Sequence, residues 1–153
     1  MKRAPQTGSV LVEAAFTLLT LFIFLFGIME AGRFFQVQQF LTDAAREGAR
    51  VAATPLTQTT TLATKAQIDL AVQPFLAAAA ITNGTVTVNC VSLSNYNTVY
   101  DTNPCSAGCP VAGVACGSQV VVSAPYQIMS LAMFSNLSIT LKGKALMRNE
   151  TSP

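Results

Sequence analysis

The sequence predicts an α+β fold, with a long N-terminal helix whose first half spans a membrane and a small domain after it. Two observations lead to this prediction. An apolar run of twenty residues begins at Val10, and apolar side chains at helical spacing continue from it to about residue 53. The second half of the chain alternates apolar and polar residues in several short stretches, which favours a helix packed on a three- to four-stranded antiparallel sheet.

The N-terminal run is long enough to cross a membrane. Sixteen uncharged residues lie between Glu13 and Glu30, and the whole run as a helix measures roughly 30 Å, about one hydrocarbon thickness. Its Leu, Ile and Phe side chains favour insertion by about 3–6 kcal/mol, more than the roughly 2.5–3.5 kcal/mol that a carboxylate costs at the bilayer centre. Lys2 and Arg3 precede the run, so the positive-inside rule predicts a cytoplasmic N-terminus and export of the residues after about 33.

Three interpretations of this segment compete. A secretory signal peptide would be cut near Ala31, but a large side chain stands two residues before that position. A plain membrane anchor leaves Gly8 and Glu13 without a role. A leader of residues 1–8, cut before Ser9 as in prepilins, uses both, because the new Ser9 ammonium lies four residues from Glu13 on one helix face. In a filament that amine can pair with the Glu13 carboxylate of a neighbouring subunit and fix the register between them, so the third interpretation is favoured.

The helix is expected to continue beyond the membrane. Small or apolar residues recur there at steps of three or four, at Phe34, Val37, Leu41, Ala44 or Ala45, Gly48 and Val51. Thr54 followed by Pro55 predicts the end of the helix. The expected organisation is a leader at 1–8, a helix at 9–53, a linker at 54–61 and an exported domain at 62–153.

Residues 8–53 carry a resemblance to a known family. The stretch Ala44-Ala45-Arg46-Glu47-Gly48-Ala49-Arg50-Val51-Ala52-Ala53, placed after Val12-Glu13, an apolar run and Gly27-Ile28-Met29-Glu30-Ala31-Gly32-Arg33, resembles the TadE-like family of tight-adherence (type IVb, Flp-type) pilus systems. The residues that match the family's motif are Glu30, Arg33, Ala45, Arg46, Glu47, Gly48, Ala49 and Arg50. A weaker similarity covers the C-terminal part, with a Val-rich strand, an aromatic residue after Pro125 and a terminal Met147-Arg148-Asn149-Glu150.

The resemblance implies a minor pilin or pseudopilin that takes part in assembly of such a pilus, and hence in adhesion, biofilm formation and surface colonisation. It implies processing by a prepilin peptidase, with Gly8 as the last leader residue, Ser9 as the mature N-terminus and Glu13 as the carboxylate that the peptidase and the assembly machinery recognise. Subunit pairing is then assigned to Ser9 and Glu13. The expected partners are the peptidase, other pilin and minor pilin subunits, and the inner-membrane assembly platform.

The subfamily and the role stay open at this point. Ala14 stands where major Flp pilins usually have an aromatic residue, which favours a minor subunit, but related TadF- and TadG-like chains share the alanine-arginine-glycine segment. One alternative is a single-span, membrane-anchored periplasmic binding module that enters no filament; it needs neither the cut after Gly8 nor the Glu13 carboxylate. A type II secretion pseudopilin is another, and it usually has an aromatic residue just after the cut, where this chain has Ser9.

The composition argues against catalysis and nucleic-acid binding. Only 10% of the residues are charged, and a chain that starts at Ser9 has seven basic and seven acidic side chains, so no basic patch remains for phosphates. There is no His, and the carboxylates beyond residue 55 are the dispersed Asp69, Asp101 and Glu150. The sequence therefore predicts a structural protein of the inner membrane with no enzyme activity, no cofactor, no metal and no small-molecule substrate.

The exported domain is expected to hold a helix at about 61–81, in which Pro74 causes a break or marks a second short helix. Strands are expected at 85–91, 118–123 and 137–145, with a long loop at 92–117. Four cysteines in an exported chain predict two disulfides, with three possible connectivities. Cys90–Cys116 is favoured because it joins the ends of two strands, and Cys105–Cys109 then closes a small ring in the loop. A zinc site is disfavoured by the cysteine spacings and the absence of His.

Overall fold

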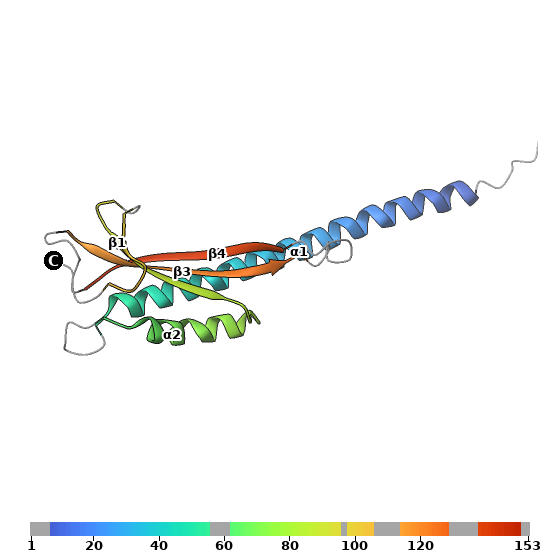
Figure 1. The fold of residues 1–153 in the computed structure, drawn as a ribbon. Coiled ribbons are helices and arrows are strands. Elements are labelled where there is room, and N and C mark those ends of the chain that lie inside the picture. The colour runs from blue at the N-terminus through green and yellow to red at the C-terminus, as the bar shows by residue number, and fades with distance from the viewer. Residues whose placement is uncertain (1–6, 56–61, 96–97, 106–113, 129–137, 151–153) are drawn as a thin grey trace, which may run out of the picture.

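The computed structural model describes residues 7–55, 62–95, 98–105, 114–128 and 138–150. A long N-terminal helix leads into a small domain of one further helix and a four-stranded antiparallel sheet, so the predicted fold class is confirmed (Figure 1). The elements in chain order are α1 (Thr7–Ala53), α2 (Lys65–Ala78), β1 (Thr85–Ser92), β2 (Val99–Asp101), β3 (Cys116–Gln127) and β4 (Ser138–Arg148). Most of the expected linker at 54–61 lies outside the described residues.

Helix α1 runs without interruption through 47 residues, about 70 Å. It ends at Ala53 because Pro55 disfavours the helical conformation of the residue before it. Thr54 closes the last turn, with its backbone N–H and its hydroxyl both donating to the Arg50 carbonyl at 3.2 and 3.0 Å. The end expected from the Thr54 and Pro55 pair is thus the observed one.

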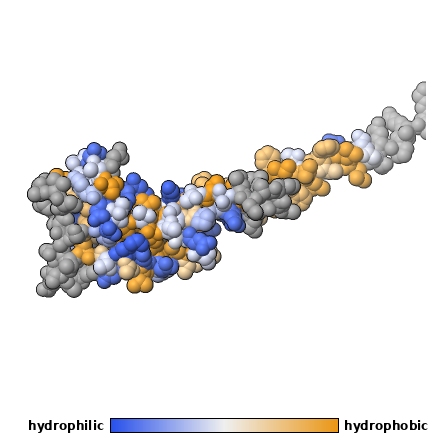
Figure 2. All heavy atoms as spheres, viewed as in Figure 1, coloured by the Kyte–Doolittle hydropathy of each residue, from blue (hydrophilic) through white to orange (hydrophobic). Residues whose placement is uncertain are grey.

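The two halves of α1 have opposite surroundings. The first half projects away from the domain and is covered by hydrophobic side chains (Figure 2). Its large apolar residues are at least half exposed, from 51% at Leu21 to 73% at Leu11. Among the described residues, α1 is the one helix long and apolar enough to cross a membrane. Exposed apolar surface of this extent is costly in water, so it fits a single-pass membrane segment.

The second half of α1 lies on one face of the sheet, beside α2. The strand order is β2-β1-β3-β4, with β3 and β4 paired over eleven residues and β1 and β3 over eight. Exposed side chains such as Thr85, Thr87 and Lys142 stand on the other face of the sheet. The core between helices and sheet includes Leu41, Ile68, Val72, Val88, Val120 and Val122, all fully buried.

Small residues allow α1 to lie close to its neighbours. Ala44, Ala45, Ala49 and Ala52 have no exposed surface. A Cβ atom added to Gly143 of β4 would stand 2.1 Å from the Leu41 carbonyl oxygen, so α1 and β4 meet backbone to backbone there.

Helix α2 continues through Pro74, so the expected break at this residue is wrong. Pro74 lacks an N–H group, and the carbonyl that loses its partner is that of Leu70, four residues earlier. Both residues lie on the exposed side of α2, and Leu70 is 71% exposed, so water can replace the missing hydrogen bond. Burial of Ile68, Val72 and Leu76 on the opposite side then holds the helix together.

The cysteine pairing differs from the expected one: Cys90 is bonded to Cys105, with their Cα atoms 4.9 Å apart. Cys90 stands opposite Ser118 in the sheet, so Cys116 is its diagonal neighbour, at about 7–8 Å, which is too far for a disulfide. Strand β2, too short to be predicted, returns the chain along β1 and brings Cys105 to Cys90. Both Cys90–Cys116 and Cys105–Cys109 are therefore wrong. Cys116 is also disulfide-bonded, and Cys109 lies outside the described residues.

Candidate functional site: the N-terminal helix and its junction with the domain

The residues predicted for processing stand on the first two turns of α1. Gly8, Ser9 and Glu13 are all exposed, and nothing lies within 4 Å of a Cβ atom built on Gly8. Ser9 and Glu13 share one face of the helix, as their spacing of four requires. The Glu13 side chain makes no ion pair within the part of the chain that the structure describes. This end of α1 is therefore open to contact with another molecule.

Polar side chains inside the apolar half of α1 are satisfied by the helix itself. The hydroxyl of Thr17 donates to the Glu13 carbonyl at 2.8 Å, and that of Thr20 donates to the Phe16 carbonyl at 2.9 Å. Such back-bonding removes the cost of placing a hydroxyl in hydrocarbon. The two threonines are therefore compatible with a membrane-spanning segment.

Directly after the apolar run, two motif residues meet the end of β3. We call Glu30, Arg33 and Phe34 of α1, together with Tyr126 of β3, the junction cluster. The Tyr126 hydroxyl donates to the Glu30 carboxylate at 2.6 Å, and that carboxylate is 3.6 Å from the Arg33 guanidinium. The guanidinium lies 5.5 Å from the centre of the Tyr126 ring, and the Phe34 ring packs edge-on to the same ring at 5.9 Å.

The hydrogen-bonded pair of the junction cluster, Tyr126 and Glu30, is largely shielded from water, whereas the Arg33 side chain is 41% exposed. Tyr126 is 5% exposed and the Glu30 side chain 17%. Burial, helped by the neighbouring Glu30 carboxylate, raises the pKa of Tyr126 above its ordinary value of 10. The phenol therefore stays protonated and keeps donating its hydrogen bond at neutral pH. Its chemical role is to bind the domain to the first turn of α1 beyond the apolar run.

The alanine-arginine-glycine motif divides into a buried and an exposed side. Ala45, Gly48 and Ala49 face the core, and a Cβ atom on Gly48 would stand 2.9 Å from Val72 of α2 and 3.1 Å from Val120 of β3. The charged members pair along the helix. Arg46 is 3.3 Å from Asp43, and Arg50 makes two hydrogen bonds to Glu47, one of them at 2.9 Å. The hydrogen bond from Arg50 lowers the pKa of the Glu47 carboxyl.

The C-terminal end of α1 is capped by the C-terminal residues of the described chain. The backbone N–H of Glu150 donates to the Ala53 carbonyl at 3.2 Å. The Ser118 hydroxyl donates to the Asn149 side-chain oxygen at 2.8 Å and lies 3.4 Å from the Ala52 carbonyl. Asn149 is only 2% exposed. The Ala53 carbonyl, which the helix end leaves without a partner, is thus satisfied by the segment after β4, and Ser118 of β3 lies beside the carbonyl before it.

Sequence reasoning did not identify Tyr126, Ser118 or Asn149 as partners of α1. The aromatic residue after Pro125 and the terminal Met147-Arg148-Asn149-Glu150 stood out in the sequence only through their similarity to the family. Among the described residues, no group of three or more His, Cys, Asp or Glu side chains is placed to hold a metal ion.

The comparison with protein families found one match. Residues 8–50 match the model of the family described as "TadE-like protein". No curated protein and no solved structure matches the chain. The matched range covers the apolar half of α1, the Glu30 and Arg33 positions of the junction cluster, and the buried glycine of the motif. The resemblance seen in the sequence is therefore confirmed over residues 8–50.

Proposed function

With residues 8–50 of this chain matching the TadE-like family, we propose that the protein is a minor pilin or pseudopilin of a tight-adherence (type IVb, Flp-type) pilus. A prepilin peptidase removes residues 1–8, and the mature chain begins at Ser9. It is held in the inner membrane by one span, with a cytoplasmic N-terminus and the domain on the periplasmic side. From there it takes part in pilus assembly with other pilin subunits and the inner-membrane platform, and so contributes to adhesion and colonisation.

The observation that carries this proposal is the continuity of α1. One helix holds an exposed apolar half and, without a break, the buried half that forms the core of the domain. Cleavage near Ala31, as in a secretory signal peptide, would remove Glu30 and with it the hydrogen bond from Tyr126. A cut before the apolar run, after Gly8, keeps both halves in the mature protein. The geometry therefore favours a leader that leaves the helix attached.

Glu13 has a physical role in this proposal. In the apolar interior of a filament a lone carboxylate is strongly destabilising, and an ammonium close to it removes much of that cost. The free amine that cleavage creates at Ser9 provides such a partner on a neighbouring subunit. Only subunits at the correct axial offset bring the two charges together. The ion pair then fixes the axial register between neighbouring subunits.

The test is the intact mass of the membrane-extracted protein, expressed with and without its prepilin peptidase. We expect the loss of residues 1–8 only when the peptidase is present, and no loss in a Gly8→Leu variant. Gly27→Leu is the matched control, because Gly27 is likewise exposed on α1 with open space around it and should be cut normally. An uncut chain in the presence of the peptidase would instead support a tethered periplasmic binding module, and a cut near Ala31 a secreted protein.

A further inference from the structure

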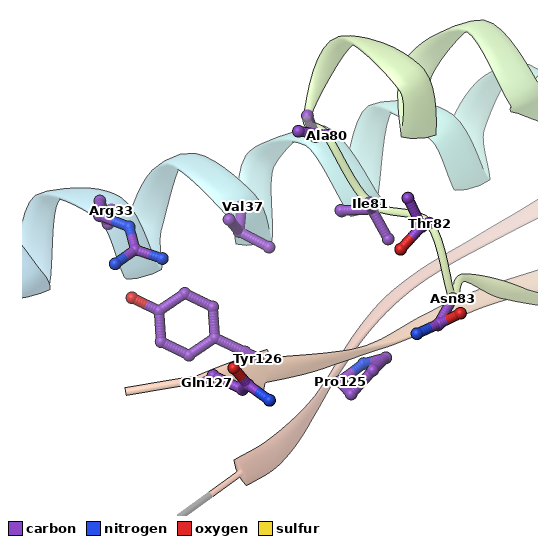
Figure 3. Close-up of a pocket in the computed structure, with 10 residues that line it drawn as sticks. Arg33, Val37, Ala80, Ile81, Thr82, Asn83, Pro125, Tyr126 and Gln127 are labelled. Atoms are coloured by element: carbon purple, nitrogen blue, oxygen red, sulfur yellow. The ribbon is translucent and has the colours of Figure 1, made fainter. Parts of the chain in front are cut away.

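A polar pocket of about 340 Å³ opens beside the junction cluster (Figure 3). Its walls come from three places: Arg33 and Val37 of α1, the turn after α2 with Thr82 and Asn83, and the end of β3 with Tyr126 and Gln127. In Figure 3 the Arg33 guanidinium and the Tyr126 ring face each other on one side, and Thr82 and Asn83 stand across the hollow. Of the described residues that line it, Arg33 is the one with a charge.

The depth of this pocket follows from the geometry of α1. If the hydrocarbon layer ends near Met29, Arg33 lies about 6 Å beyond it along the helix. The polar headgroup layer on each side of a bilayer is roughly 5–8 Å thick. The guanidinium therefore stands at headgroup level, with the rest of the pocket just above it. This step rests on α1 spanning the membrane, which is part of the proposed function.

The pocket offers the chemistry that binds a phosphate group. A guanidinium carries five N–H donors in a planar fork that matches phosphate oxygens. The face of the Tyr126 ring and the Glu30 carboxylate hold this guanidinium in place. Thr82, Asn83 and Gln127 add uncharged polar side chains that can donate hydrogen bonds. Glu30 itself does not line this pocket and instead borders a second hollow, which Tyr126 also lines.

That second hollow, of about 390 Å³, is apolar and reaches down to Gly27, inside the hydrocarbon level. Phe34, Phe35, Ile128 and Ile139 line it. Tyr126 borders both hollows, so a polar pocket at headgroup level adjoins an apolar surface that extends down to acyl-chain level at Gly27. A free anion would bind in the polar pocket alone, whereas an amphiphile contacts both the polar pocket and the apolar surface.

We propose that the polar pocket binds the phosphate-bearing headgroup of a phospholipid from the bilayer that α1 crosses. The lipid phosphate lies against Arg33, and its acyl chains follow the apolar half of α1. The bound lipid sets the height of the domain above the membrane, because the junction cluster that holds it joins the helix to the sheet.

The test is native mass spectrometry of the full-length protein released from lipid nanodiscs of phosphatidylethanolamine and phosphatidylglycerol. We expect one retained phospholipid per chain in the wild type, and at least about a tenfold lower retention in Arg33→Gln, since a hydrogen bond to a charged group is lost. Arg46→Gln is the matched control, because Arg46 is also paired with an acid three residues earlier but lies far from the pocket. It should retain lipid like the wild type.

Further measurements distinguish a bound phospholipid from a free anion and from a second copy of the chain. Asn83→Leu leaves the junction cluster intact and should also lower retention, which covers the case that Arg33→Gln disturbs the fold. Added inorganic phosphate should leave the retained lipid unchanged; displacement of the lipid by phosphate would make the pocket a free-anion site and overturn the proposal. Equal retention in the wild type and both pocket variants would overturn it too, as would a dimer lost in Arg33→Gln with lipid retention unchanged. A sample co-expressed with the prepilin peptidase is measured in parallel, and cleavage after Gly8 is scored in its spectra, so failure of the pilin assignment is seen separately.

Discussion

The Tyr126 hydroxyl and the Glu30 carboxylate are 96 positions apart in the chain and 2.6 Å apart in the structure. Glu30 is the first charged residue after the apolar run. Because its carboxylate is partly removed from water, it needs a hydrogen-bond donor beside it. The Tyr126 hydroxyl is that donor. The Tyr126 ring also makes a cation–π contact with the Arg33 guanidinium and packs edge-on against the Phe34 ring. A single side chain therefore joins the first turn of α1 beyond the apolar run to the sheet.

Replacing Tyr126 by Phe is expected to destabilise the protein by about 1–3 kcal/mol, because the partly buried Glu30 carboxylate loses its donor while the ring packing is kept. Thermal unfolding in detergent at neutral pH, followed by circular dichroism, measures this. Tyr100→Phe is the control, since Tyr100 lies on β2, away from the junction cluster. A melting temperature equal to that of the wild type would show that the hydrogen bond adds nothing to stability.

The same residue predicts a pH dependence. The pKa of Tyr126 is raised by folding, so the stability it contributes is fully present below the unfolded value of 10 and is lost as the pH rises through the higher folded value. The wild type should therefore lose stability above pH 10 more steeply than Tyr126→Phe. Melting temperatures of both proteins across this range give the comparison. Parallel pH profiles would contradict the assignment.

The sequence predicted Glu30 and Arg33 as motif residues but not their partner. Which residue of β3 reaches Glu30 depends on how α1 lies on the sheet and on the register of β3 with its neighbours, and neither is encoded in local periodicity. The same holds for Ser118 and Asn149 at the other end of α1. Processing at Gly8, Ser9 and Glu13 stays a prediction, because it concerns other molecules.

At the scale of elements, the closeness of α1 to β4 and α2 depends on glycines with very different surroundings. Gly32 on α1 has open space where a Cβ would stand, Gly48 would place one against two valine side chains, and Gly143 would place one against the backbone of α1. A side chain can move aside, but two packed backbones cannot separate without moving a whole element.

An alanine series at these three positions tests that packing. Gly32→Ala should stabilise the helix by about 1 kcal/mol through helix propensity. Gly48→Ala should cost about 1–3 kcal/mol through overpacking against Val72 and Val120, and Gly143→Ala more than that, enough to lower the folded yield. Unfolding midpoints in detergent measure the order of stability of the three variants. A Gly143→Ala protein as stable as Gly32→Ala would show that α1 does not lie on β4 at this point.

The disulfide between Cys90 and Cys105 gives a second test at this scale. Digestion without reduction, using elastase and chymotrypsin because no Lys or Arg lies between Lys65 and Lys142, should yield a peptide linking Cys90 to Cys105. Replacing both by Ser should cost about 3 kcal/mol, the value for a loop of some 15 residues. Recovery of a Cys90–Cys116 peptide would contradict the observed pairing.

The long elements were predictable because their periodicity is local. Helix α1, helix α2 and three of the strands stand where the sequence placed them, within a few residues. Strand β2 was not predicted, since three residues carry too little pattern, and that omission led to the wrong cysteine pairing. Pro74 was given too much weight, because the cost of a proline in a helix depends on whether the freed carbonyl faces water.

At the scale of the whole molecule, the two halves of α1 make different kinds of contact. From Phe34 onwards the helix uses its apolar and small side chains within its own chain, on the sheet and α2. Before Glu30 its large apolar side chains are at least half exposed in the described structure, which fits contact with lipid, with other subunits or with both. Residues that govern assembly are therefore expected in the first half, and residues that govern folding in the second.

Glu13→Ala tests this division directly. The substitution touches no contact of the domain, and it removes a charge from the membrane span, so the variant should insert and fold at least as well as the wild type. Without the carboxylate, the Ser9 ammonium of a neighbouring subunit loses its partner, and incorporation into filaments should fall to background. Immunoblots of the membrane fraction and of sheared pili, in cells that make the other subunits and the peptidase, measure the two quantities.

Thr17→Ala is the matched control for Glu13→Ala, because Thr17 lies one turn further on the same face and hydrogen-bonds only within its helix. It should remain in filaments. Normal incorporation of Glu13→Ala would remove the carboxylate from the assembly mechanism, whereas loss of Glu13→Ala from the membrane fraction as well would show that the charge acts at insertion. Retention in the membrane together with absence from pili, in a chain whose mass shows the cut after Gly8, is the result that pairing between subunits predicts. An uncut Glu13→Ala chain would instead assign the carboxylate to recognition by the peptidase.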